Sequence, residues 1–334
     1  MKRIHNIYNQ ISFYDNLALA FYKASMGKKR KNEVLEYRSN LDKNLKILQN
    51  QIIRVEPDVG HYRFFVIRDP KLREICAPSF KEMVLHHAIM NICEPVLDNY
   101  SIFNSYACRK NKGTVKAIYR CQEYVRKNQW YLKMDIKKYF DSIHHEIAIK
   151  LVSHKFKEKS LIMIFQKILD TYHKKPSKGV PIGNLISQHL ANYYLGPFDH
   201  WMIEVQRRKY YIRYMDDFIV FGQCKKELKE LLEQIQKYLS EQLDLELKHT
   251  TQLNRTCIGV PFLGFRIFKN IIQLTPNSKK RFIKKFKQYE HNYEMGVWDS
   301  QTFVKHIEPL FAFVQTGNTL SFRRNVINRF GVLS

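Results

Sequence analysis

Residues 210–221 read Tyr210-Tyr211-Ile212-Arg213-Tyr214-Met215-Asp216-Asp217-Phe218-Ile219-Val220-Phe221. The aromatic and β-branched residues on both sides of the acids are typical of buried strands. Successive side chains of one straight strand point to opposite faces, so Asp216 and Asp217 would not reach one site from a strand interior. A tight turn between two short strands removes this difficulty. We therefore predict a β-hairpin that carries both carboxylates at its tip.

Two carboxylates at such close range repel each other, and one becomes protonated unless cations share the site. Oxygen-only ligands of this kind suit Mg²⁺. The alternative is an acidic turn on the protein surface, which is the commoner setting for two adjacent Asp residues. The apolar frame around Asp216 and Asp217 argues against a surface turn, because surface segments rarely have this composition. The sequence therefore predicts a cation site at the hairpin tip.

The charge balance of the chain points to a polyanionic partner. Among 334 residues, 56 are Lys or Arg and 31 are Asp or Glu, which gives a net charge of +25. This excess is far larger than solubility requires, and nucleic acid is the simplest partner that explains it. A membrane surface is the alternative. It is disfavoured because the sequence has no stretch of 18 apolar residues and no helix with one continuous basic face.

Composition also indicates the class of protein and its compartment. With 45% hydrophobic and 13% aromatic residues, the chain can bury a core. The first residues are not followed by an apolar run, so we expect no signal peptide. The six cysteines are scattered without any Cys-x-x-Cys pair, as in proteins of a reducing compartment. We therefore expect a globular cytoplasmic protein without a zinc site or disulfide framework.

Hydrophobic periodicity predicts helices and hairpins in alternation. Helical spacing is found over residues 1–60, 80–97, 114–128, 150–170, 185–201 and 225–239, and again in the tail from residue 276. Strand composition is found over residues 62–67, 72–77, 130–136 and 245–248, and residues 262–267 are predicted to lie in another hairpin. This alternation favours the α+β class over a doubly wound parallel sheet.

Three further segments carry candidate chemistry. Asp135 stands at the end of the predicted strand 130–136, where it could supply a third carboxylate to the cation site. The loop 105–114 is dense in hydrogen-bond donors, and the basic loop 174–183 precedes a helix that begins near Asn184 or Ser187. The pairs His86-His87 and His144-His145 lack metal-ligand spacing, so we assign them to packing.

In their order along the chain, these motifs resemble a reverse transcriptase over residues 60–270. The order is a basic hairpin, an Arg loop, an Asp at a strand end, a Gly loop with its helix, Tyr-x-Asp-Asp, a Lys strand and a Leu-Gly hairpin. Within the reverse transcriptases, the segment 181–188 indicates which subfamily this chain resembles. Intron maturases and retroviral enzymes usually have Gln where this chain has Ile182, and maturases commonly have Pro where it has Gln188. This pattern resembles the reverse transcriptases of diversity-generating retroelements, which are related to intron-type enzymes.

The resemblance implies a right-hand polymerase fold with fingers, palm and a short helical thumb. The expected boundaries are 1–60 for an N-terminal helical extension, 61–130 for the fingers, 131–149 for the first part of the palm, 150–184 for a fingers–palm connection, 185–275 for the palm and 276–334 for the thumb. No segment after residue 276 has nuclease-like or zinc-ligand character, so we expect polymerase chemistry alone.

The resemblance also implies a set of catalytic residues. Asp135, Asp216 and Asp217 are expected to hold two Mg²⁺ ions, for which Mn²⁺ is expected to substitute, with the main chain of Ile136 as a further ligand. Two metals in such a site activate the primer 3′-hydroxyl and stabilise the leaving pyrophosphate. Lys248 matches a family position near that pyrophosphate, where it would act as a general acid. An ordinary exposed lysine is the alternative for Lys248.

The resemblance also implies residues that bind the nucleotide, the primer and the template. Lys71 and Arg73 are expected to hold the triphosphate, because Lys and especially Arg bind phosphate oxygens. Phe140 is expected to lie under the deoxyribose, and Ile182 and Gln188 to line the nascent base pair, with core packing as the alternative for Phe140 and Ile182. The expected primer and template contacts are Arg109, Tyr214, Met215, Leu263, Gly264, Lys280 and Lys284.

The expected partners are a template RNA, an RNA/DNA primer–template, deoxynucleotides and, by resemblance, an oligomer of a small basic accessory protein, with no membrane. Copying is expected to be error-prone at template adenines. Two alternatives stay open. One is a bacterial reverse transcriptase of intron, retron or phage-defence type, and the other is a polymerase-shaped RNA-binding scaffold without catalysis. The three acids argue against the scaffold, because a scaffold has no need to crowd carboxylates.

Overall fold

The computed structural model describes residues 4–68 and 72–331. The chain divides into two compact units, and each unit is built from three separate stretches of the sequence. The first comprises Met1–Arg109, Asp135–Arg208 and Glu233–His249. The second comprises Lys110–Met134, Lys209–Leu232 and Thr250–Ser334.

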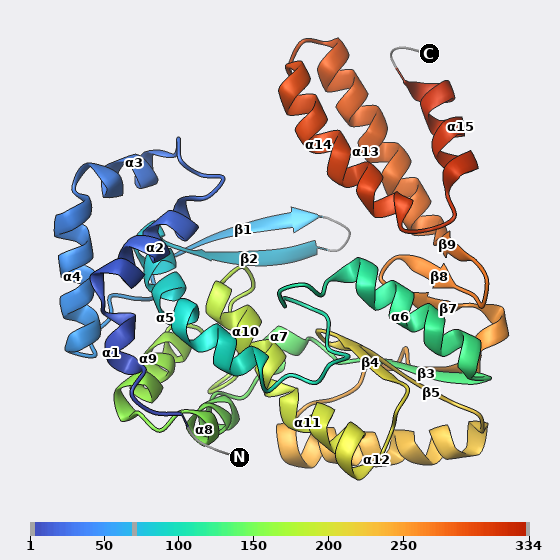
Figure 1. The fold of residues 1–334 in the computed structure, drawn as a ribbon, viewed down its shortest axis with the longest axis horizontal. Coiled ribbons are helices and arrows are strands. Elements are labelled where there is room, and N and C mark those ends of the chain that lie inside the picture. Colours follow the sequence, from blue (N-terminus) through green and yellow to red (C-terminus); the bar gives the residue numbers. More distant parts are fainter. Residues whose placement is uncertain (1–3, 69–71, 332–334) are drawn as a thin grey trace. The chain divides into compact units, whose positions relative to one another are not determined.

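Helices make up most of the first unit (Figure 1). Its N-terminal part contains α1 (Tyr8–Ile11), α2 (Tyr14–Ser25), α3 (Asn32–Ser39), α4 (Leu41–Ile53) and α5 (Phe80–Asp98). Helix α2 packs along α5, and rings of Phe21, Tyr37 and Phe80 from three helices meet in an aromatic cluster. The hydroxyl of Ser79 caps α5 by accepting a hydrogen bond from the Glu82 amide at 3.3 Å.

A two-stranded antiparallel hairpin extends away from these helices (Figure 1). It consists of β1 (Tyr62–Arg68) and β2 (Leu72–Pro78), so both predicted strands are confirmed. The predicted turn at Asp69 and Pro70 lies outside the described residues, as does Lys71. Only the end of β2 near Cys76 and Pro78 is buried, and the rest of the hairpin is exposed or half-buried.

The remaining helices of the first unit are α7 (Tyr139–Ser142), α8 (His145–Lys155), α9 (Lys159–Asp170), α10 (Leu185–Tyr194), α11 (Gly196–His200), a π-helical turn (Trp201–Val205) and the second half of α12 (Lys225–Leu243). The sequence predicted one helix over residues 185–201. The structure breaks it after Tyr194, because Pro197 lacks an amide hydrogen and is placed in the first turn of a new helix.

The second unit is built on an antiparallel sheet. Its strand order is β4 (Tyr211–Tyr214), β5 (Asp217–Gly222), β3 (Trp130–Asp135) and β6 (Gln252–Arg255), and α6 (Thr114–Lys127) packs against β4. Strand β3 leaves this unit at its last residue, Asp135, where the chain enters the first unit. Together with the helical first unit, this sheet confirms the predicted α+β class.

The strand predicted around residues 245–248 is wrong. Leu247 makes only an isolated bridge to Ile136, and the true strand, β6, follows it. The Leu245 amide instead bonds to the Leu239 carbonyl at the end of α12 at 2.9 Å. The apolar alternation of this segment therefore reflects burial of a helix exit rather than a sheet ladder.

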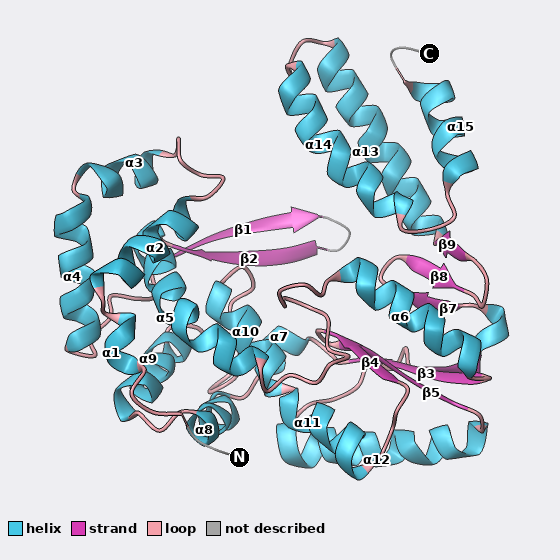
Figure 2. Cartoon of the chain, in the orientation of Figure 1, coloured by secondary structure: helices cyan, strands magenta, loops and turns pink. Residues whose placement is uncertain are grey.

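The C-terminal part of the second unit joins a small sheet to three helices (Figure 2). Strands β7 (Val260–Phe262), β8 (Phe265–Ile267) and β9 (Ile272–Leu274) precede α13 (Pro276–Glu294), α14 (Ser300–Gln315) and α15 (Leu320–Phe330). The three helices pack around aromatic rings, namely Phe282, Phe286, Phe311 and Phe322. Of the helices in the described ranges, none has both the length and the apolar character that a membrane span requires.

Candidate active site

The acidic hairpin of the second unit forms as predicted. Strands β4 and β5 pair with Tyr214 opposite Asp217, so Met215 and Asp216 form the turn and Asp217 opens β5. Met215 takes a left-handed backbone conformation with φ of 56°, which a tight two-residue turn favours. Both acids are half-buried, whereas Phe218 behind them is fully buried. The tip therefore presents carboxylates on a rigid support.

A buried arginine, which the sequence reasoning missed, holds this turn. Arg213 has no exposed surface, and its guanidinium donates to the Met215 carbonyl at 3.0 Å. A signal was available, because an arginine between Ile212 and Tyr214 in an apolar strand has to find buried polar partners. The bond fixes the backbone conformation that presents Asp216.

A lysine pairs with the second acid of the tip. Lys133 lies on β3, and its Nζ atom is 2.9 Å from Oδ2 of Asp217. Each side chain is 19% exposed. The local sequence around Lys133 carries no signal for this pairing.

In the first unit, Asp135 and Lys248 form a second ion pair. Their backbones are also joined, because the Lys248 amide donates to the Asp135 carbonyl at 2.8 Å, next to the bridge between Ile136 and Leu247. Ile136 is fully buried. The structure therefore places Lys248 beside an expected catalytic acid, which does not fit the alternative of an ordinary exposed lysine. Its role as a general acid stays a prediction.

The donor chemistry of these acids fits a divalent cation. Asp135 and Asp217 each form an ion pair with a lysine ammonium, so both carboxylates lie beside a positive charge. Carboxylate oxygens are the ligands that Mg²⁺ prefers. No three His, Cys, Asp or Glu side chains of residues 4–68 and 72–331 gather into a group that could hold a metal ion. The three-carboxylate site therefore stays a prediction.

The expected nucleotide residues of the first unit lie on a connected backbone framework. The Val180 amide donates to the Phe140 carbonyl at 2.8 Å, and the Cys76 amide of β2 donates to the Ile182 carbonyl at 2.8 Å. Phe140 and Ile182 are half-buried. The loop that carries Ile182 is thus bonded to the exposed hairpin on one side and to the Phe140 turn on the other.

Gly183 explains how closely that loop approaches the hairpin. Its φ is +109°, and a Cβ atom there would lie 2.8 Å from Cγ2 of Ile75. Glycine is therefore required by both the backbone conformation and the space. Of the two residues expected near the start of this helix, Asn184 is the N-cap of α10, and its side chain accepts from the Ile186 amide at 2.9 Å.

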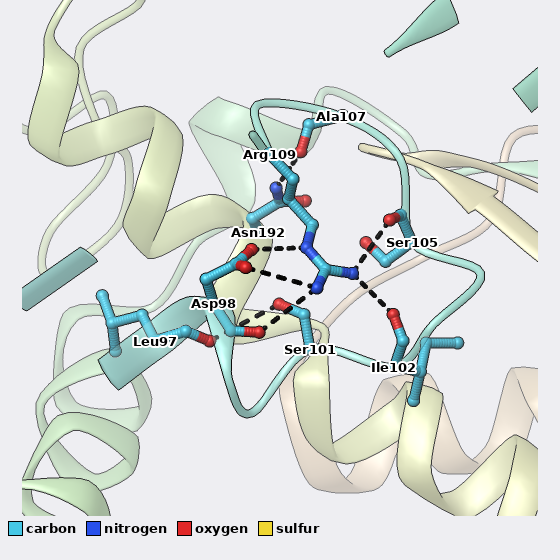
Figure 3. Close-up of polar contacts among 8 residues, drawn as sticks. All are labelled: Leu97, Asp98, Ser101, Ile102, Ser105, Ala107, Arg109 and Asn192. Atoms are coloured by element: carbon cyan, nitrogen blue, oxygen red, sulfur yellow. Dashed lines mark hydrogen bonds and ion pairs between the residues drawn. The ribbon is translucent and has the colours of Figure 1, made fainter. Parts of the chain in front are cut away.

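Arg109, an expected primer or template contact, is engaged inside its own loop (Figure 3). Its Nε donates to Asp98 Oδ1 at 2.5 Å, and its terminal nitrogens donate to the carbonyls of Ile102 at 2.6 Å, Ser105 at 3.0 Å and Asp98 at 3.3 Å, and to Asp98 Oδ2 at 3.4 Å. A guanidinium has five donor hydrogens, and these contacts use all five. The geometry favours loop closure over the expected primer or template contact.

The closed loop contacts helix α10. The Asn192 side chain donates to the Ala107 carbonyl at 2.5 Å. Desolvation raises the pKa of the Cys108 thiol, so the sulfur keeps its proton and donates to Oε1 of Gln188 at 3.7 Å. Gln188, an expected base-pair contact, is therefore oriented by the loop that Arg109 closes.

The remaining expected contacts lie on exposed or half-buried positions. Arg73 on β2 is exposed, and in the second unit the Tyr214 hydroxyl bonds to the Thr114 hydroxyl at 3.1 Å. Lys280 and Lys284 lie exposed on α13. These positions are compatible with nucleic-acid contacts, which stay predictions.

The Leu-Gly hairpin is confirmed and docks on α13. Leu263 and Gly264 form the turn between β7 and β8, with φ of 49° and 88°. The Gly264 carbonyl accepts from the Thr275 amide at 3.1 Å and from the Ser278 hydroxyl at 2.8 Å. A Cβ atom at Gly264 would lie 2.9 Å from that hydroxyl. The turn is therefore attached directly to the first turn of the basic helix.

Comparison with known proteins agrees with this arrangement. Residues 67–267, more than half of the chain, match the family model described as reverse transcriptase (RNA-dependent DNA polymerase). The chain belongs to the reverse transcriptase family. The match begins in the exposed hairpin and ends in β8, so it includes both ion-paired acids and the Leu-Gly turn.

Curated relatives of this reverse transcriptase include intron-encoded proteins. Protein YkfC of Escherichia coli is 24% identical over 292 residues, covering 69% of this chain and 76% of YkfC. The putative COX1/OXI3 intron 2 protein of Saccharomyces cerevisiae is 22% identical over 64% of this chain and 32% of its own length. The group II intron-encoded protein LtrA of Lactococcus lactis is 26% identical over 41% of this chain. The chain spans only 24% of LtrA.

Solved structures show the same fold. The apo telomerase of Candida tropicalis superimposes with a TM-score of 0.53 at 12% identity, over 87% of this chain and 64% of the telomerase chain. The same telomerase in complex with a fragment of telomeric RNA gives a TM-score of 0.50 over 85% of this chain and 58% of its own. These likenesses show a polymerase fold of the right-hand type.

Proposed function

We propose that this chain synthesises DNA on an RNA template from deoxynucleotides. Asp135, Asp216 and Asp217 would hold two divalent cations, which would lower the charge barrier to attack of the primer hydroxyl on the α-phosphate. The observation that carries the proposal is the rigid acidic tip of a reverse transcriptase sheet. In that sheet, the strand that ends in Asp135 is the neighbour of the strand that opens with Asp217.

The chain's own residues would contribute binding and orientation. Arg73 on the exposed hairpin would bind the triphosphate, and Phe140 would pack under the deoxyribose. Lys248 would deliver a proton toward the leaving pyrophosphate. Lys280 and Lys284 would contact the backbone of the primer–template, and the complex of the telomerase neighbour with an RNA fragment supports RNA binding.

Primer extension on a defined RNA template tests this function. The wild-type chain should extend a DNA primer with deoxynucleotides in Mg²⁺ or Mn²⁺ and should stop when EDTA removes the cation. The matched sample is the Asp135→Asn variant, in which the carboxylate charge is lost at almost constant volume. Extension by both proteins alike would show that the acids serve another purpose, and RNA binding without extension by either would favour the scaffold.

At finer detail, we propose an error-prone enzyme of a diversity-generating retroelement, with a small basic accessory protein as its partner. The support is Ile182, which is apolar where related enzymes usually carry Gln. Its carbonyl is bonded to the hairpin, but its side chain offers no hydrogen bond to a base pair. A site without that bond discriminates less against mispairs, by about tenfold for one hydrogen bond.

Sequencing the cDNA from one adenine-containing template tests the finer proposal. The wild-type enzyme should misincorporate mainly opposite adenine, and Ile182→Gln should lower that error about tenfold, from the worth of one hydrogen bond. Equal error spectra of the two proteins would show that Ile182 has a packing role and does not affect fidelity. An accurate wild-type enzyme would favour the intron-type lineage, to which the LtrA relative belongs.

A further inference from the structure

The pair between Lys133 and Asp217 is less exposed than the pair between Lys127 and Glu123 of the same unit. Its Nζ–Oδ2 distance is 2.9 Å, and each side chain is only 19% exposed. The pair between Lys127 and Glu123 in the same unit has a similar distance of 2.8 Å, but its side chains are 52% and 38% exposed. Solvent screens the exposed pair strongly, whereas the partly buried pair keeps more of its Coulomb interaction.

The position of Lys133 in the sheet gives this pair a consequence for catalysis. Lys133 lies on β3, the direct neighbour of β5, which Asp217 opens. Asp216 is the preceding residue, so two carboxylates stand within one turn, and their repulsion has to be offset by positive charge. The ammonium of Lys133 supplies one such charge within the protein itself.

We propose that Lys133 is a positioning residue of the metal centre. Its ammonium holds the Asp217 carboxylate in place when no divalent cation is bound, and it lowers the affinity of the acidic tip for that cation. This inference rests on the proposed function, because it takes Asp216 and Asp217 as cation ligands. It adds a residue that sets how much divalent cation the enzyme needs.

The sign of the effect follows from electrostatics. A divalent cation that binds beside Asp217 meets the positive charge of Lys133 a few ångströms away, and the two repel each other in a partly buried site. Removing that charge strengthens cation binding. A lysine with only a structural role would destabilise the fold on removal and leave the intrinsic cation affinity unchanged.

The test is a direct Mn²⁺ titration at pH 8, followed by electron paramagnetic resonance. Wild-type protein, Lys133→Met, Lys133→Arg and the exposed control Lys127→Met are compared. Lys133→Met should bind Mn²⁺ about tenfold more tightly than wild type, from loss of a nearby unit charge. Lys133→Arg and Lys127→Met should stay within about twofold of wild type, since each keeps the charge at the tip. Unchanged or weaker binding by Lys133→Met would overturn the proposal.

A second readout guards against a folding defect. Thermal unfolding with and without Mn²⁺ should show that Lys133→Met melts lower than wild type in EDTA and gains more from the cation, because tighter binding stabilises the native state further. Lys133→Gln, which keeps a polar head, is measured in parallel and should shift in the same direction. An equal Mn²⁺-induced gain in all three proteins would contradict the inference.

One further variant separates this inference from the proposed function. Asp216→Asn should remove the tight Mn²⁺ site. If it leaves Mn²⁺ binding intact, the acids are not the cation ligands and the proposed function itself fails. If Asp216→Asn removes the site but Lys133→Met does not tighten it, only the role of Lys133 fails.

Discussion

The hairpins β1–β2 and β4–β5 have similar apolar sequences but opposite burial. In β1, Phe64, Phe65, Val66 and Ile67 are 54%, 42%, 57% and 41% exposed. In β5, residues 218–220 have no exposed surface. The first hairpin is a two-stranded sheet on its own, whereas the second lies in a four-stranded sheet with α6 packed against β4.

From this difference we infer that the exposed hairpin β1–β2 presents a ligand surface and that the buried hairpin β4–β5 supports chemistry. An isolated two-stranded hairpin is marginally stable in water, and contiguous exposed apolar side chains mark a binding surface. The buried hairpin β4–β5 is packed against β3 and α6, so its tip can hold charged groups in fixed positions. We therefore expect substitutions in β4–β5 to affect catalysis and stability, and those in β1–β2 to affect binding alone.

The largest effect is expected at the acidic tip. Asp216→Asn keeps the side-chain volume but removes the charge that holds a cation, so extension should fall by a factor of about 10³ or more. RNA affinity should change little, because it rests on distributed Lys and Arg. Single-turnover extension and RNA binding by fluorescence anisotropy measure the two quantities. Near-normal extension by Asp216→Asn would show that the acidic tip takes no part in catalysis.

A second test concerns the anchor of the exposed hairpin. Gly183→Ala places a Cβ atom 2.8 Å from Ile75 at a φ of +109°. Strain and overlap together should cost about 2–4 kcal/mol, measured by urea denaturation. Gly27→Ala is the control, because its φ is +71° but no atom lies within 4 Å of the added Cβ. Equal losses in both variants would mean that backbone strain alone matters and that the hairpin contact is loose.

Substituting one arginine in each hairpin compares the two hairpins directly. Arg213→Met removes the buried guanidinium that donates to the Met215 carbonyl, so the free energy of unfolding should fall by about 1–3 kcal/mol and extension should fall with it. Arg73→Met on the exposed hairpin should leave stability unchanged and raise the KM for deoxynucleotides. Thermal melts and steady-state kinetics of both variants provide the check. A lower melting temperature for Arg73→Met would show that Arg73 contributes to stability, against the expectation from its exposed position.

The smallest effect separates the two faces of β1–β2. Ile67 is paired with Arg73 and shares its face, whereas Val66 is paired with Glu74 on the other face. Ile67→Ser should raise the deoxynucleotide KM by a few-fold, about the loss of one partly exposed apolar contact. Val66→Ser should leave it unchanged. If Val66→Ser has the larger effect, the opposite face of the hairpin meets the substrate.

Local patterns were sufficient for most elements. The helical spacing in α4, the strand composition of β1 and β2, and the helix start near Asn184 are all properties of neighbouring residues, and each matches the structure. The prediction around residues 245–248 was wrong because apolar alternation signals burial, which a helix exit supplies as readily as a strand. The break after Tyr194 was missed although Pro197 was visible in the sequence.

The sequence by itself determined the acidic hairpin, the α+β class and the order of motifs, because turn chemistry and hydrophobic period act over a few residues. Only the tertiary structure decided the partners of the charged side chains. Arg109 turned inward to its loop, and Lys133 and Lys248 came to two different acids. The partners of Lys133 and Lys248 lie 84 and 113 residues away in the chain, so no local pattern specifies them, whereas Arg109 bonds to groups within 11 residues of itself. These pairings form because half-buried charges need compensation where the folded backbone brings opposite charges together.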